Sequence, residues 1–149
     1  MKRLALLGVL LAAVLLTGCL APKVNFKIEP NPIEVTFEKF ELAGVKLQVT
    51  LSGFSFGYTV EAAVIEVRDN EGEVVFEDTV KLNKKIPVIP GWTETVDLPT
   101  VSLASMLSEI ASEYTEAAYD QKLKDKTFEL EITLTGKNPT SGKVDLVFK

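Results

Sequence analysis

Histidine is absent from the sequence, and cysteine occurs once, as Cys19. The usual ligand sets of zinc and copper sites need histidine or several thiols, so the composition excludes them. It also excludes catalysis by a Ser-His-Asp or Cys-His arrangement. A single cysteine cannot form an intramolecular disulfide, so the fold must rest on packing. These absences predict a protein that has no cofactor or metal and is not an enzyme.

Clusters of basic residues are missing as well. The 149 residues include 16 Lys and Arg against 21 Asp and Glu, which gives a net charge of -5. An acidic chain without a basic patch is unsuited to nucleic acid and to binding anionic lipid headgroups by charge. We therefore expect no nucleic-acid partner, and any membrane contact has to come from another feature.

The N-terminal segment has the composition of an export signal. Lys2 and Arg3 precede an uncharged, apolar run over residues 4–16. A run of about a dozen residues is too short for the ~30 Å hydrocarbon core of a bilayer, but it matches the apolar region of a signal peptide. We predict that residues 1–18 are cleaved. Residues 23–149 are then enough for a single domain with a real core.

The end of this run, Leu16-Thr17-Gly18-Cys19, resembles the lipobox of prokaryotic lipoproteins. The resemblance implies that Cys19 carries a covalent lipid and that residues 19–22 form a short lipidated tether. The domain would then be anchored to a membrane outside the cytoplasm, at the cell surface or in the periplasm. One acyl chain binds weakly, at about 0.8 kcal/mol per buried methylene, so stable anchoring implies several chains. The alternative is an ordinary secretory signal with an incidental cysteine.

Alternation of polar and apolar residues, the pattern of half-buried strands, recurs along the rest of the chain. Turn residues separate the alternating segments, and two prolines mark residues 83–92 as a loop or an edge segment. Seven or eight short strands favour an immunoglobulin-like antiparallel β-sandwich, with a small barrel as the alternative. The predicted strands cover residues 23–29, 33–38, 45–52, 60–67, 73–82, 93–98, 127–135 and 143–148.

The period changes to helical spacing between Leu103 and Ala118. This predicts one amphipathic helix near residues 102–119, with Ser102 as its N-cap. The apolar face of the helix could bind a partner, and packing against the core is the alternative.

Four aromatic residues are candidates for an interaction surface. Phe54, Phe56 and Tyr58 alternate with small residues, and Trp92 follows a Pro-Gly pair. Exposed aromatic side chains mark interaction sites, so these residues could present rings to a sugar, a lipid or a protein partner. The alternative is that the rings pack in the core and that Trp92 closes one end of the sandwich.

Acidic residues are the remaining candidates for chemistry. A hydrolase needs two carboxylates facing each other across a cleft, whereas nearly all of those present fall on the polar side of a predicted strand or helix. The turn at residues 69–72, Asp-Asn-Glu-Gly, could hold calcium through oxygen ligands. It lacks the spacing of an EF-hand loop and fits a hairpin turn better. No catalytic or metal-binding residue is assigned.

Three stretches resemble the water-stress-and-hypersensitive-response (WHy) domain of the late embryogenesis abundant family, a β-sandwich also found in exported proteins. Residues 33–52 are similar to its opening strands, residues 86–99 to its Ile-Pro and Val-x-Leu-Pro segment, and residues 128–148 to its closing hairpin. Residues 52–54 replace the family's Asn-Pro-Asn motif. The resemblance implies a non-enzymatic module that protects client proteins under stress. The alternative is an accessory lipoprotein that docks a protein complex or a carbohydrate.

Overall fold

The computed structural model describes residues 23–52, 58–87, 89 and 92–149. Strands make up 57% of these residues and two short helices are present, so the chain is mainly β. The predicted signal peptide and tether, together with Phe54 and Phe56, lie outside the described residues.

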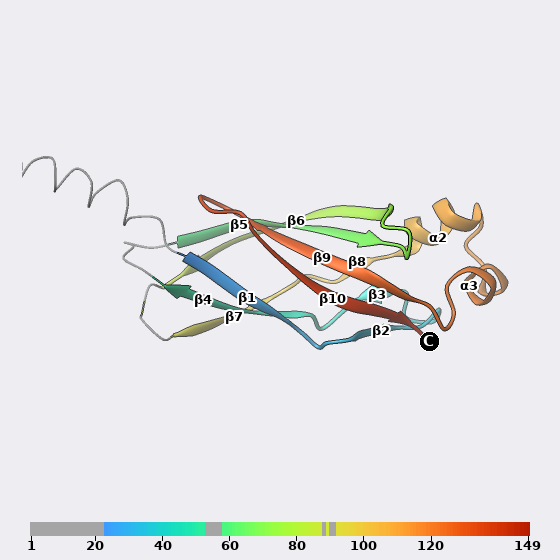
Figure 1. The fold of residues 1–149 in the computed structure, drawn as a ribbon, viewed down its shortest axis with the longest axis horizontal. Coiled ribbons are helices and arrows are strands. Elements are labelled where there is room, and N and C mark those ends of the chain that lie inside the picture. Colours follow the sequence, from blue (N-terminus) through green and yellow to red (C-terminus); the bar gives the residue numbers. More distant parts are fainter. Residues whose placement is uncertain (1–22, 53–57, 88, 90–91) are drawn as a thin grey trace, which may run out of the picture.

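The strands form a curled five-stranded sheet, a three-stranded sheet and a small two-stranded sheet (Figure 1). In the five-stranded sheet the order is β2-β10-β9-β5-β6, in the three-stranded sheet β1-β4-β7, and in the third β3-β8. The elements, in chain order, are β1 (Lys23–Glu29), β2 (Ile33–Val35), β3 (Glu41–Leu42), β4 (Lys46–Ser52), β5 (Tyr58–Arg68), β6 (Val74–Ile86), β7 (Thr93–Asp97), β8 (Val101–Ser102), α2 (Ala104–Ala111), α3 (Glu116–Lys122), β9 (Thr127–Thr135) and β10 (Thr140–Phe148).

Each of the eight predicted strands is present, but the prediction of a purely antiparallel arrangement is wrong at β2. This strand pairs in parallel with β10, with Ile33 opposite Leu146 and Val35 opposite Phe148. Two prolines between β1 and β2 interrupt the ladder, because proline has no N–H to donate. The chain therefore leaves the three-stranded sheet after β1 and joins the edge of the five-stranded sheet, still running in the same direction.

The prediction of one helix over residues 102–119 is also wrong, since α2 and α3 are separate helices. Ser112 ends α2 in the left-handed region, with φ of 58°. Thr115 begins the next helix as its N-cap, and its hydroxyl accepts the N–H of Ala118 at 3.1 Å. Ser102, the predicted N-cap, lies in β8, and Leu103 occupies the N-cap position of α2.

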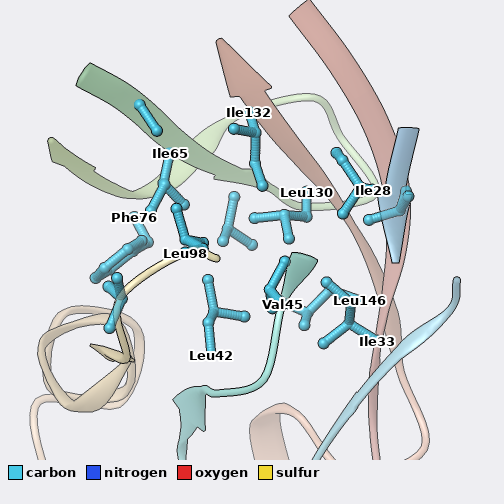
Figure 2. Packing of buried hydrophobic residues seen from close by; sticks show 14 of the residues in the cluster. Ile28, Ile33, Leu42, Val45, Ile65, Phe76, Leu98, Leu130, Ile132 and Leu146 are labelled. Atoms are coloured by element: carbon cyan, nitrogen blue, oxygen red, sulfur yellow. The ribbon is translucent and has the colours of Figure 1, made fainter. Parts of the chain in front are cut away.

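A single hydrophobic core fills the space between the two larger sheets. Strand β9 shows how it is built, because alternate residues from Phe128 to Leu134 are buried. Figure 2 shows Ile65 and Ile132 of the five-stranded sheet pointing toward the interior that also receives Leu42 and Val45. Each fully buried side chain of this size stabilises the fold by roughly 1.5–3 kcal/mol. Apart from the tyrosines, no polar or charged side chain among the described residues is buried.

The helices and the start of β1 lie at opposite ends of the molecule (Figure 1). Helices α2 and α3, and the C-terminal end of β10, occupy one end, which we name the helical end. Lys23 begins β1 at the other end, which we name the tether end because the predicted tether directly precedes Lys23. The fold therefore separates two candidate surfaces along its long axis.

Candidate functional site

Tyr58, predicted to belong to an interaction surface, is buried at the start of β5. Its side chain is 3% exposed, and its hydroxyl donates to the carbonyl oxygen of Asn138 at 3.1 Å. Burial raises the pKa of this hydroxyl above its ordinary value of 10.0. A Cβ at Gly136 would lie 2.8 Å from the Tyr58 hydroxyl, so the glycine permits this contact. Tyr58 is a core residue that ties β5 to the β9–β10 turn.

Trp92 is exposed at the tether end, one residue before β7. Half of its side chain, 51%, is accessible, and the same fraction of Ile89 is accessible on the loop before it. The indole Nε1 donates to Glu94 Oε2 at 3.0 Å, and the Trp92 backbone N–H donates to the carbonyl oxygen of Ile89 at 3.0 Å. The second carboxylate oxygen of Glu94 lies 3.8 Å from Lys84 Nζ. These contacts hold the ring in place at the surface.

Polar side chains cover the outer face of the three-stranded sheet. The hydroxyls of Thr50 and Thr93 lie 3.1 Å apart, and Thr95 donates to Gln48 Oε1 at 2.9 Å. A depression on this face is lined by Asn25, Phe26, Lys27, Gln48, Thr50 and Thr93. The sequence alternation identified the polar residues of this set only as the solvent-facing side of separate strands, and Phe26 as part of the apolar side of β1. Their arrangement as one surface depends on the register of the three strands.

The helix face predicted as a partner-binding surface is mostly part of the core. Met106, Leu107 and Ala118 are buried, which confirms the alternative of core packing for these residues. Tyr119 is also buried, and its hydroxyl lies 3.0 Å and 2.9 Å from the carbonyl oxygens of Val35 and Lys149.

Burial is the main cause that raises the pKa of Tyr119 to about 12, and the nearby carboxylate of Asp120 adds to the shift. The ring also packs edge-on against Phe40 and Phe148, with centroids 5.6 Å and 6.3 Å away. Tyr119 therefore closes the helical end of the core.

The acidic turn between β5 and β6 is a hairpin turn, as one of the two interpretations predicted. Asp69 Oδ1 accepts the backbone N–H groups of Glu71 and Glu73 at 2.9 Å and 3.0 Å, and Gly72 adopts a positive φ of 84°. The carboxylate of Asp69 therefore accepts hydrogen bonds from the backbone of the turn itself. Within residues 23–52, 58–87, 89 and 92–149, no cluster of three or more acidic or cysteine side chains is arranged to hold a metal ion.

No protein-family model matches the chain, and no curated protein matches it either. The resemblance to the WHy domain therefore stays a prediction. None of the described helices is both long enough and apolar enough to cross a membrane. The function has to be argued from the tether end, the sheet faces and the sequence that precedes them.

Proposed function

We propose that the chain is an exported lipoprotein in which a lipid on Cys19 anchors a non-enzymatic β domain to a membrane, at the cell surface or in the periplasm. The observation that carries the proposal is the lipobox-like Leu16-Thr17-Gly18-Cys19, which ends only four residues before β1. Because β1 begins at the tether end, the anchor would hold the domain by one end and leave the helical end facing away.

The domain is proposed to be an immunoglobulin-like sandwich. The order β10-β9-β5-β6 corresponds to strands G, F, C and C′ of a variable-type domain, and β1-β4-β7 corresponds to strands A, B and E. The connections from β4 to β5 and from β6 to β7 each cross from one sheet to the other, as Greek-key connections do. The common core of the two sheets supports the same assignment.

A Cys19→Ser substitution tests the anchor. The serine hydroxyl cannot replace the thiol that accepts the lipid, so the variant should lose its lipid and leave the membrane fraction while the domain still folds. Fractionation, intact mass and circular dichroism of the domain measure the three results. Cys19→Ser protein that stays in the membrane fraction as wild type does would contradict the proposal, and Thr17→Ala, which keeps a small residue, is the control.

The domain is further proposed to protect client proteins, as the WHy resemblance implies. Its three similar stretches map onto β2 to β4, onto the end of β6 with β7, and onto the hairpin β9–β10, which are structural parts of one sandwich. The test heats and freezes a labile enzyme with the purified lipoprotein or with an equal mass of inert protein. We expect more activity to survive with the lipoprotein. Equal survival would rule out the protective role and leave the anchor proposal unaffected.

A second candidate function is docking of a carbohydrate by the outer face of the three-stranded sheet. The observation that favours it is the depression on this face, where the amide and hydroxyl groups of Gln48, Thr50 and Thr93 lie together with Phe26. Sugars bind to such combinations of hydrogen-bonding groups and an aromatic residue. Binding to immobilised polysaccharide that is lost in Gln48→Ala and Thr50→Ala, but not in the helical-end variant Tyr114→Ala, would support it over protection.

A further inference from the structure

Lysines from three separate parts of the chain gather at the tether end. Strand pairing fixes their positions. Lys23 opens β1, Lys81 pairs with Ala62, and Lys84 and Lys85 pair with residues still nearer the start of β5.

Lys137 lies in the β9–β10 turn. This turn is at the same end, because Thr140 Oγ1 approaches the carbonyl oxygen of Val24 at 3.5 Å. The lysine side chains are all exposed. We name this group the basic end; it consists of Lys23, Lys81, Lys84, Lys85 and Lys137.

The basic end has a charge opposite to that of the rest of the domain. Only two acidic residues accompany its five lysines: Glu61, and Glu94, which reaches Lys84. The end therefore carries a net charge of about +3, while residues 23–149 as a whole contain 14 basic and 21 acidic residues. The remainder of the domain is strongly negative. A domain that is acidic overall thus presents a positive surface where its N-terminal segment emerges.

Two exposed apolar side chains lie at this same end. Trp92 directly precedes β7, whose first residue Thr93 pairs with Thr50 near the end of β4. The carbonyl oxygen of Ile89 accepts the backbone N–H of Trp92. Tryptophan is the residue most enriched at the boundary between lipid and water, where its ring lies in the headgroup region. Lysines flanking a tryptophan fit an anionic lipid surface, because the ring enters the interface while the ammonium groups contact phosphates.

We propose that the tether end seats directly against an anionic bilayer, with the basic end on the lipid headgroups and Trp92 and Ile89 in the interface. The proposal rests on the lipid anchor at Cys19. Four residue steps join Cys19 to Lys23, and a fully extended chain covers roughly 14 Å over that distance. The end therefore lies close enough for electrostatic attraction, which decays over a Debye length of about 8 Å at physiological salt. The basic surface cannot be read from the sequence, because only folding brings its lysines together.

The fluorescence of Trp92 tests the proposal, because it is the only tryptophan in the chain. The full-length lipidated protein is reconstituted into phosphatidylcholine vesicles, with or without phosphatidylglycerol. We expect a blue-shifted emission and quenching by phospholipids brominated near the headgroup when phosphatidylglycerol is present. High salt should weaken both.

The double variant Lys84→Glu/Lys85→Glu should reduce the quenching several-fold. Its matched control is Lys124→Glu/Lys126→Glu at the helical end, which changes the charge equally and should leave the quenching unchanged.

Flotation of the vesicles separates the two proposals. If the protein floats but the Trp92 emission is not quenched, the seating is overturned and the anchor is unaffected. The same holds if the quenching is equal with and without phosphatidylglycerol and does not change in either double variant. Protein that does not float with either vesicle overturns the anchor and the seating that rests on it. A Trp92 ring shielded from aqueous quenchers but not quenched by brominated lipid would also overturn the seating, because the ring would then be buried away from the lipid.

Discussion

At the scale of single residues, Tyr119 carries the clearest structural role. Its hydroxyl approaches two backbone carbonyl groups, those of Val35 in β2 and of Lys149 at the end of the chain. Its side chain is 1% exposed, so these carbonyl oxygens would lose a partner if the hydroxyl were removed. The helix predicted near residues 102–119 ends at Tyr119, but the sequence did not reveal this bridge between distant segments.

Tyr119→Phe should lower the free energy of unfolding at neutral pH by about 1 kcal/mol, the usual value of a lost buried hydrogen bond. Because the pKa of Tyr119 is raised to about 12 in the folded state from 10.0, the folded state holds this proton more tightly. Wild type should therefore lose stability as the pH rises from 10.0 toward 12, and the difference between wild type and Tyr119→Phe should shrink over that range.

Urea unfolding at a series of alkaline pH values measures this difference. Tyr114→Phe is the control, because Tyr114 is 47% exposed. A difference between wild type and Tyr119→Phe that stays constant to pH 12 would contradict the assigned cause of the pKa shift.

At the scale of elements, the break between α2 and α3 shows where periodicity misleads. The apolar residues from Leu103 to Ala118 continue at helical spacing, so the sequence favours one helix. The structure interrupts it at Ser112, and Thr115 caps the second helix. Periodicity reports which side chains are buried. It does not report whether the backbone turns between them, since both helices bury their apolar faces in the same core.

Ser112→Gly should raise the free energy of unfolding by roughly 0.5–1 kcal/mol, because glycine adopts the left-handed region without a Cβ penalty. Ser108→Gly is the matched control in the interior of α2, where glycine should lower stability by a similar amount. Thermal unfolding compares the two variants. A Ser112→Gly variant that is destabilised as much as Ser108→Gly would show that a continuous helix is the stable form.

Strand β6 is a long strand at the edge of the five-stranded sheet. The two prolines after it indicated an edge segment, and β6 is the last strand of the five-stranded sheet. Exposed charged residues such as Glu77, Lys81 and Lys84 line it, and Asn83 adopts a positive φ of 46° near a shift in its pairing register. Charges and irregularities of this kind oppose pairing with another chain.

At the scale of the whole molecule, one hydrophobic core joins the two large sheets, so we expect them to unfold together. Leu130 in β9 is fully buried, and Leu→Ala substitutions at such sites cost about 2–5 kcal/mol. Leu130→Ala should lower the free energy of unfolding by this amount, which shifts the urea midpoint to a lower concentration. Far-ultraviolet circular dichroism, which follows both sheets, and the fluorescence of Trp92, beside the three-stranded sheet, should report the same transition.

Separate transitions for these two probes would show that the sheets unfold independently. Thr127→Ala is the control, because Thr127 lies on the same strand with an exposed side chain and should shift the midpoint little.

The sequence by itself determined eight of the ten described strands, most of the buried residues, the hairpin turn at Asp69 and the candidate anchor at Cys19, because these depend on local alternation, turn chemistry and short spacing. Only the tertiary structure decided the parallel pairing of β2 with β10, the burial of Tyr58 and the exposure of Trp92. It also decided that lysines from three parts of the chain form one basic end. Such features depend on contacts between segments far apart in sequence, and local composition does not encode which segments meet.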